Sequence, residues 1–172
     1  MNYNIIVATD NKGGIGFNNS IPWYIKNDLK MFSKLTKGNN NNCVIMGRKT
    51  WESLPKKPLP NRINIILSSN LNINDKTTKT FKSIKEICEY CLFQNFENCW
   101  VIGGENIYKD FISQNLIDYI HLTIIEDSYI CDKHFDFNQN KYKLIELNEK
   151  SEIDEINNKE ITCKYCVFKK IN

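Results

Sequence analysis

Residues 43–54 read CVIMGRKTWESL, and this stretch decides the fold class. The apolar run 43–46 is typical of a strand buried in a sheet, Gly47 follows it as a turn, and 49–54 has the pattern of a short helix. Two cations and a hydroxyl, at Arg48, Lys49 and Thr50, stand at the start of that helix. A strand, a glycine turn and a helix in this order form the repeating unit of an α/β sheet.

The same order of elements recurs on both sides of this stretch. The apolar runs predict strands at 5–9, 43–46, 63–67, 99–102, 119–125 and 162–170, and the helical periodicity predicts helices at 25–35, 49–54, 83–94 and 105–114. Ser83, with Glu86 three residues later, has the spacing of a capping box and marks one helix start. The last two strands have no helix between them, so they are expected to pair antiparallel at the sheet edge. The polar segments 38–42 and 148–160 are expected to be surface turns or a long hairpin connection.

The predicted fold is α/β, with residues 1–172 as a single domain. It has a mostly parallel twisted sheet of about eight strands, an antiparallel C-terminal hairpin and about four helices. Hydrophobic residues make up 41% and charged residues 25% of the chain, which is a globular composition. The 23 Lys and Arg against 20 Asp and Glu leave a net charge of +3, too small to argue for a nucleic-acid partner.

Hydropathy argues against a membrane protein. No run approaches the roughly 20 apolar residues of a membrane span. The N-terminus carries only a short apolar run without a basic leader, unlike a signal peptide. We therefore expect a cytoplasmic protein without a membrane partner, in which the seven cysteines are buried or idle free thiols.

Two Cys-x-x-Cys pairs raise the question of a metal site. Cys163 and Cys166 lie on a predicted strand, where a spacing of three places side chains on opposite faces. Cys88 and Cys91 share one face of a predicted helix, but packing in the core explains that pair equally well. Both histidines, at 121 and 134, lack a partner for nucleophilic or metal chemistry and are expected to be structural. No metal is expected.

Two glycine turns leading into helices are suited to bind phosphate. Gly47 precedes Arg48, Lys49 and Thr50, and Gly103 with Gly104 follows the predicted strand 99–102. Free backbone N–H groups and the helix dipole favour anions at such helix starts. The arrangement is not the Gly-x-Gly-x-x-Gly fingerprint, but two such starts at one edge of a sheet suggest one long cofactor. The alternative is a pair of ordinary glycine turns with solvated charges.

Two further residues carry chemistry that a pocket could use. Asp28 lies on the helical face of Ile25, Leu29 and Phe32, and a buried carboxylate must meet a cationic or donor-rich ligand or gain a proton. The alternative is an acid at the edge of the apolar stripe. Arg62 follows the turn Pro58-Leu59-Pro60-Asn61, where its planar fork could take a carboxylate in two parallel hydrogen bonds.

Taken in order, these stretches closely resemble dihydrofolate reductase over essentially the whole chain. The motifs that carry the resemblance are Ile15-Gly16, Ile21-Pro22-Trp23, Asp28 with Phe32, VIMGRKTWESL at 44–54, PLPNR at 58–62, LSS at 67–69, and VIGG at 101–104 with Tyr108. The resemblance implies reduction of 7,8-dihydrofolate to 5,6,7,8-tetrahydrofolate with NADPH, by hydride transfer to C6 and protonation at N5. This reaction serves one-carbon metabolism and thymidylate synthesis.

The resemblance also assigns residues to roles. The expected catalytic residues are Asp28, Trp23 and Tyr108, with Asp28 as the only acid at the pterin. The expected substrate pocket comprises Ile6, Val7, Ala8, Asp28, Leu29, Phe32, Leu54, Leu59, Arg62, Ile102 and Thr123. The expected cofactor site comprises Ala8, Ile15, Gly16, Gly47, Arg48, Lys49, Thr50, Leu67, Ser68, Ser69, Lys82, Gly103, Gly104, Glu105, Asn106, Ile107 and Tyr108. Among these, Arg48 and Lys49, with Ser69 and Lys82, would meet the 2′-phosphate that distinguishes NADPH from NADH.

Further features follow from the same resemblance. Residues 11–24 look like the family's lid over the nicotinamide. Gly103-Gly104 resembles a family site with a cis peptide. The segment CDKHF at 131–135 departs from the commoner family pattern, which puts the hydrogen bonding of Asp132 to the lid in doubt. The expected partners are dihydrofolate and antifolate inhibitors, with no nucleic acid and no membrane. The chain is expected to be a monomer unless it is a domain of a thymidylate synthase fusion.

Two other functions stay open at this point. A pyrimidine reductase of riboflavin synthesis shares this kind of fold and NADPH, but Trp23 with Asp28 favours a pterin. A catalytically silent module would bind folate and nucleotide without turnover. Substrate choice distinguishes the first alternative from the expected enzyme, and turnover distinguishes the second.

Overall fold

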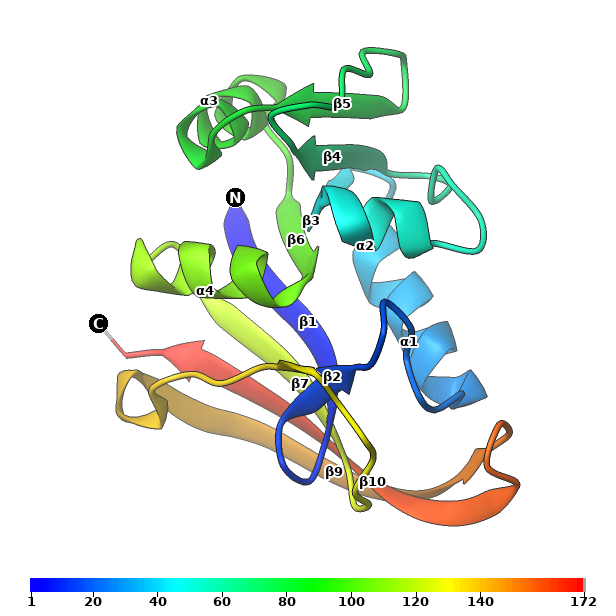
Figure 1. The fold of residues 1–172 in the computed structure, drawn as a ribbon. Helices are drawn as coiled ribbons and strands as arrows, with labels where there is room; N and C mark the ends of the chain where they lie inside the picture. Colours follow the sequence, from blue (N-terminus) through cyan, green and yellow to red (C-terminus); the bar gives the residue numbers. More distant parts are fainter. Residues whose placement is uncertain (172) are drawn as a thin grey trace.

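The computed structural model describes residues 1–171 and is built on an eight-stranded sheet (Figure 1). The strand order is β5-β4-β3-β6-β1-β7-β10-β9. These strands are β1 (Asn2–Asp10), β3 (Asn42–Gly47), β4 (Ile63–Leu67), β5 (Thr78–Phe81), β6 (Asn98–Gly103), β7 (Tyr119–Ile125), β9 (Tyr142–Asp154) and β10 (Lys159–Lys170). All neighbours from β5 to β7 pair parallel, whereas β10 pairs antiparallel with both β7 and β9. A second, two-stranded sheet joins β2 (Gly14–Gly16) to β8 (Lys133–His134).

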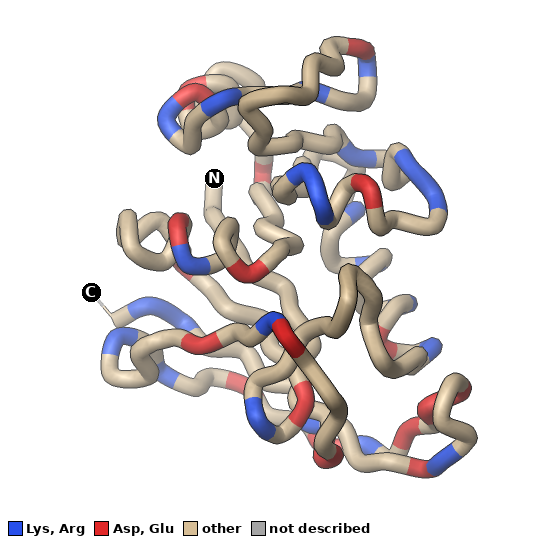
Figure 2. Tube along the Cα trace, in the orientation of Figure 1, with Lys and Arg blue, Asp and Glu red and all other residues tan. Residues whose placement is uncertain are grey.

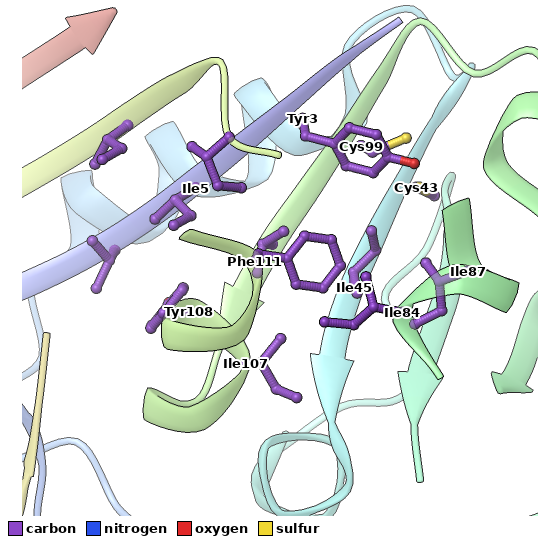
Figure 3. Close-up of a cluster of buried hydrophobic side chains, with 14 of the residues drawn as sticks. Tyr3, Ile5, Cys43, Ile45, Ile84, Ile87, Cys99, Ile107, Tyr108 and Phe111 are labelled. Carbon is purple, nitrogen blue, oxygen red and sulfur yellow. The ribbon is translucent and has the colours of Figure 1, made fainter. Parts of the chain in front are cut away.

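Four α-helices cover the two faces of the sheet. They are α1 (Lys26–Lys37), α2 (Arg48–Ser53), α3 (Ile84–Gln94) and α4 (Glu105–Ser113), and a short 3₁₀ helix η1 (Gln139–Lys141) precedes β9. Phe111 of α4 and Ile87 of α3 pack with Ile5 and Ile45 on one face, which Figure 3 shows in close-up. Trp51 of α2 and Phe32 of α1 pack on the other face. Because both faces are covered, the central strands read as continuous apolar runs.

The predicted fold class is confirmed: the sheet has eight strands and is mostly parallel, with an antiparallel hairpin of β9 and β10 at its C-terminal end. Each predicted helix and strand is present, with ends that differ by a few residues. Ser83 caps α3 as expected, and its side chain accepts a hydrogen bond from the backbone N–H of Glu86 at 3.2 Å. The Glu86 carboxylate accepts from the backbone N–H of Lys82 at 2.9 Å.

The expectation for residues 148–160 was wrong. Asn148 to Asp154 belong to β9, Lys159 begins β10, and only residues 155–158 form the turn. β9, not β10, is therefore the edge strand. A strand at the edge holds itself by backbone hydrogen bonds to one neighbour, and its exposed side chains can be polar without cost, so apolar periodicity does not reveal it. The sequence likewise missed the short strands β2, β5 and β8.

The fold brings the predicted turns to one edge of the sheet. Gly47, Leu67 and Gly103 end parallel strands, so the loops that follow them meet at the carboxyl edge, as expected for an α/β sheet. Figure 2 shows basic and acidic residues interspersed along the chain, with a basic segment at the start of α2. None of the helices within residues 1–171 is long and apolar enough to cross a membrane.

Candidate active site

Asp28 lies in the first turn of α1 and faces β7. Its Oδ1 accepts a hydrogen bond from the buried hydroxyl of Thr123 at 2.7 Å. Burial raises the pKa of the Asp28 carboxyl, the Thr123 hydrogen bond opposes this rise, and the negative charge of Glu152 adds to it. The carboxylate is therefore held in place by a neutral donor and is poised to accept a proton or to bind a donor-rich ligand.

A second carboxylate lies behind the first. Glu152 of β9 is only 6% exposed; its Oε2 accepts from Asn27 Nδ2 at 2.8 Å and its Oε1 from the Tyr165 hydroxyl at 3.0 Å. The sequence analysis did not identify this second carboxylate, whose negative charge acts on Asp28; that Asp28 is the only acid at the pterin stays a prediction. Glu152 was missed because its segment was assigned to a loop, and a Glu in a polar stretch gives no local signal of burial.

Five predicted substrate residues gather on the face of the sheet that α1 and α2 cover. They are Ile6, Phe32, Leu54, Leu59 and Ile102, which pack around the buried side chains of one core cluster. Leu29, on the exposed side of α1, keeps 43% of its surface accessible. An apolar surface beside an oriented carboxylate suits a flat, polar-edged ring.

Two other expected residues of the pocket are placed differently. Ala8 packs with Trp23 in a separate cluster near the start of α1. Val7 points to the opposite face of β1, into the core beneath α4, because side chains alternate along a strand. Its side chain therefore cannot line the pocket that Ile6 lines, and only its backbone remains available there.

Arg62 is buried without an acidic partner. It is 6% exposed, and no carboxylate within residues 1–171 forms an ion pair with it. Its Nε donates to the carbonyl of Pro60 at 2.9 Å, and its Nη1 donates to the hydroxyl of Thr36. Burial lowers the pKa of the guanidinium. A buried cation that only neutral oxygens satisfy is suited to bind an anionic ligand.

The residues that hold Arg62 escaped the sequence analysis. Thr36 is fully buried on α1, and its hydroxyl donates a hydrogen bond to the carbonyl of Phe32 at 2.8 Å. Asn64 is also fully buried: its Oδ1 accepts from the backbone N–H of Leu59 at 2.9 Å, and its Nδ2 donates to the carbonyl of Arg62 at 3.1 Å. Sequence spacing shows neither contact, since Thr36 and Arg62 lie 26 residues apart.

The two glycine turns form a shallow cradle at the carboxyl edge. Gly47 and Gly104 are the N-cap residues of α2 and α4, and neither helix has a side-chain cap, so their first N–H groups are free to meet an anion. Gly103 has a φ of +127°, and a Cβ there would lie 3.3 Å from the Tyr108 hydroxyl. A Cβ at Gly47 would lie 3.1 Å from Ile107 Cγ1. A side chain at either position would be crowded by residues of α4, so both turns favour glycine.

The structure also shows how the turn at Gly103 and Gly104 is built and how the residues of α4 that follow it are placed. The Gly103-Gly104 peptide is cis, as the resemblance predicted. Tyr108 is buried, and its hydroxyl donates to the carbonyl of Ile6 at 3.1 Å, which joins α4 to β1 beside the predicted pocket. The Ile107 side chain lies in the core, so only its backbone can reach a cofactor.

A separate pocket of about 290 Å³ opens between the ends of β4 and β5. Ser68, Ser69 and Lys82, three of the predicted cofactor residues, line it together. Arg48 starts the neighbouring helix α2, where its Nη1 lies 2.7 Å from Glu52 Oε1 in a half-exposed ion pair. Hydroxyls and a free cation in one pocket suit a phosphate group.

The predicted lid is tied to the rest of the molecule by three aspartates. Asp132 Oδ2 accepts from the backbone N–H of Asn18 at 3.1 Å, so the hydrogen bond that the departure at 131–135 put in doubt is present. Buried Asp10 accepts from the N–H groups of Lys12 and Gly14 at 2.9 and 2.8 Å. Ile15 and Gly16 lie in β2, which pairs with β8 directly after Asp132.

Asp154, in the β9–β10 hairpin, is the third of these anchors. It is fully buried and accepts from the backbone N–H of Tyr24 at 3.1 Å and from the Tyr129 hydroxyl at 2.7 Å. The Tyr129 ring packs on Trp23 with centroids 5.1 Å apart. Asp154 was missed for the same reason as Glu152, and together the two carboxylates connect the edge hairpin to the start of α1.

His121 and the pair Cys163 and Cys166 have the placements that the sequence predicted. His121 packs against Trp100 with ring centroids 5.0 Å apart, and burial lowers its pKa. Cys163 and Cys166 belong to different core clusters on opposite faces. All seven cysteines are free thiols.

Comparison of the sequence with known proteins gives matches to one family. Residues 2–170 match the sequence profile of the family described as Dihydrofolate reductase. The chain is 30% identical to a dihydrofolate reductase of Aedes albopictus, with 98% of this chain and 97% of that protein covered. It is 35% identical to the Drosophila melanogaster dihydrofolate reductase, with 78% and 79% covered. A bifunctional dihydrofolate reductase-thymidylate synthase of Plasmodium berghei is 40% identical over 73% of this chain and 24% of its own length.

Proposed function

Because this chain belongs to the dihydrofolate reductase family, we propose that it reduces 7,8-dihydrofolate to 5,6,7,8-tetrahydrofolate with NADPH. The observation that carries the proposal is the Asp28 carboxylate, which the Thr123 hydroxyl orients beside an apolar cluster. Arg62, a buried cation without an acidic partner within residues 1–171, follows Leu59 of that cluster in the chain. A carboxylate for the pterin, an apolar wall for the rings and a guanidinium for the glutamate match the three parts of this substrate. The product would serve one-carbon metabolism and thymidylate synthesis.

Asp28 has two tasks in this proposal. Its carboxylate accepts hydrogen bonds from the amidine edge of the pterin, with Thr123 fixing the orientation of Oδ1. The raised pKa of Asp28 favours a proton at the site, which supports protonation of N5. Burial is the main cause of that raised pKa, and Glu152 reinforces it. Trp23, which precedes α1 and packs at a tilt against the Tyr129 ring, would complete the wall of the site on the lid side.

The cofactor site fits a phosphorylated dinucleotide. The glycine cradle would bind its pyrophosphate, because the first N–H groups of α2 and α4 have no side-chain cap and can meet an anion. Bound NADPH supplies the hydride for C6. The pocket that Ser68, Ser69 and Lys82 line would bind the 2′-phosphate. Arg48 and Lys49, which directly follow Gly47 at the start of α2, would contribute positive charge to the same phosphate. Tyr108 holds the carbonyl of Ile6 in place beside the reacting rings.

The lid and the assembly complete the proposal. Residues 11–24, anchored by Asp10, Asp132 and Asp154, would close over the nicotinamide and exclude water. We expect the chain to act as a cytoplasmic monomer, or as one domain where it is joined to a thymidylate synthase as in the bifunctional relatives.

The test is the loss of NADPH absorbance when dihydrofolate is added to the full chain. Turnover that a methotrexate-type inhibitor blocks, and that falls sharply with NADH, is the expected result. Turnover of a pyrimidine of riboflavin synthesis instead of dihydrofolate would replace the proposal with the pyrimidine reductase. Tight binding of both ligands without turnover would replace it with the silent module.

A further inference from the structure

Three cysteine side chains meet in the core at the end of the sheet away from the active site. Cys43 of β3, Cys91 of α3 and Cys99 of β6 are fully buried, and their three sulfur atoms lie within 4.8 Å of one another. The Sγ atoms of Cys43 and Cys91 are 3.9 Å apart. We call these residues the thiol cluster. It is the one group of potential metal ligands of this kind within residues 1–171.

The sheet register creates the cluster. Cys99 of β6 pairs with Cys43 of β3 on one side and with Tyr3 of β1 on the other. The side chains of Tyr3, Cys99 and Cys43 therefore form a row across three adjacent strands. Figure 3 shows Tyr3, Cys43 and Cys99 near one another, with Ile84 and Ile87 of α3 in the same cluster of buried side chains. Cys91 reaches down from α3 onto the row. Free cysteines often fill apolar cores singly, but here three thiols from separate elements converge on one another.

We propose that Cys43, Cys91 and Cys99 form a trigonal site for a soft metal ion, Cu(I). The ligand set consists of sulfur alone, and thiolates select soft ions such as Cu(I) over Mg²⁺ or Ca²⁺. A structural zinc site needs four ligands, whereas this cluster offers three. Metal–thiolate bonds of about 2.3 Å in a plane require sulfurs about 4.0 Å apart. The 3.9 Å between Cys43 and Cys91 already satisfies this requirement.

A neighbouring hydroxyl provides a second, independent observation. The Tyr3 hydroxyl is buried at the cluster's end of β1, where it faces the thiols of Cys88 and Cys91 and makes no hydrogen bond of ordinary geometry within residues 1–171. An unpartnered buried hydroxyl is costly, and thiols are weak acceptors. Thiolates that bind a metal carry negative charge and accept hydrogen bonds better, so loading the cluster would offer this hydroxyl an acceptor.

The site is separate from the proposed reaction. Cys43 and Gly47 lie four residues apart on β3, and a strand rises about 3.3 Å per residue, so about 13 Å separates the cluster from the glycine turn. Metal binding would stabilise the fold by joining α3 to β3 and β6, without a part in hydride transfer.

The experiment titrates the reduced full chain with Cu(I), under anaerobic conditions, against a chromogenic Cu(I) chelator. The expected result is one equivalent of copper withheld from the chelator, with X-ray absorption showing three sulfur neighbours. Cys91→Ala and Cys99→Ala should lose this equivalent, while Cys166→Ala, which removes a buried thiol on β10 outside the cluster, should keep it. Turnover of dihydrofolate by each variant shows that it is folded.

The outcomes are decisive in either direction. Wild-type protein that yields all of its copper to the chelator overturns the proposal, as does a Cys91→Ala variant that still withholds one equivalent. A spectrum of wild-type protein with four ligands, or with nitrogen or oxygen neighbours, overturns the trigonal assignment even if the variants fail to fold. Loss of turnover with copper still bound would count against the proposed function and not against this site.

Discussion

Replacing Arg62 with Leu tests how the pocket binds the far end of the substrate. The guanidinium has five N–H donors, of which one meets the carbonyl of Pro60 and one the hydroxyl of Thr36. Three donors are left, enough for two parallel hydrogen bonds to the α-carboxylate of the substrate's glutamate. Arg62→Leu removes both bonds and keeps an apolar side chain beside Leu59.

The size of the effect follows from those two bonds. A hydrogen bond to a charged group contributes about 1.5–3 kcal/mol, so two contribute about 3–6 kcal/mol. We take the lower part of that range, about 3–4 kcal/mol, because the freed carboxylate can regain water. The KM for dihydrofolate should then rise about 100- to 1000-fold. The kcat should change little, because the lost contact is remote from the ring and is equally strong in the ground and transition states.

The assay compares two substrates and two variants. Steady-state kinetics with dihydrofolate are set beside those with a dihydropterin that lacks the aminobenzoylglutamate tail. Arg62→Leu should impair only the first substrate, and Lys56→Leu, which removes an exposed cation from the same loop, should impair neither. If Arg62→Leu reduced kcat/KM equally for both substrates, Arg62 would act by shaping the site and the assignment of the carboxylate would be refuted.

Other residues give predictions of the same kind. Asp28→Asn should lower turnover at pH 7 by about 100-fold or more. Asp110→Asn, which changes an exposed carboxylate on α4, is the control and should leave turnover unchanged. Asp28→Asn should also raise the free energy of unfolding: the folded pKa of Asp28 is raised above its usual 3.8, so the wild-type carboxylate costs stability as pH rises through that range. Thermal unfolding from pH 4 to 8 checks this, and a less stable Asn variant at pH 7 contradicts it. Thr123→Val removes the hydrogen bond that lowers the Asp28 pKa, so the pH at which kcat/KM falls on the alkaline side should move higher. If that pH is unchanged or lower, Asp28 is not the titrating group. Lys82→Ala should raise the KM for NADPH about fivefold and leave the KM for NADH unchanged, and equal effects on both cofactors would exclude a 2′-phosphate contact. Asp154→Ala should lower the free energy of unfolding by about 2–4 kcal/mol in urea titrations, because the half-buried Tyr129 hydroxyl and the Tyr24 N–H lose the buried carboxylate that accepts from them; a loss below about 1 kcal/mol would mean that water replaces it.

Much of the fold could be predicted because its signals are local. The runs 43–46, 63–67 and 99–102 are continuous and apolar since these strands are buried on both faces, and Gly47 and Gly103 mark turns that a side chain would block. β9 gave no such signal. Most of its side chains, from Lys143 to Ser151, face solvent at the sheet edge, and backbone hydrogen bonds to β10 hold the strand whatever those side chains are.

Two residues of the candidate site also gave a signal in the local sequence. Asp28 stood out as an acid on an apolar stripe, and Arg62 as a cation after a rigid turn. Their partners did not: Thr123 is 95 residues from Asp28, and Thr36 is 26 residues from Arg62. Glu152 and Asp154 carried no signal, because a carboxylate in a polar segment looks the same whether it is solvated or buried.

The sequence by itself therefore determined the four helices and the six strands predicted from apolar runs, in their succession along the chain, together with the two glycine turns and the motifs of the dihydrofolate reductase family. Only the tertiary structure decided which distant side chains meet: Thr123 with Asp28, Thr36 with Arg62, and Cys91 with Cys43 and Cys99. The physical reason is the range of the interactions. Periodicity and turn chemistry depend on neighbours within a few residues, whereas these contacts depend on strand order and register, which arise only when the whole sheet has formed.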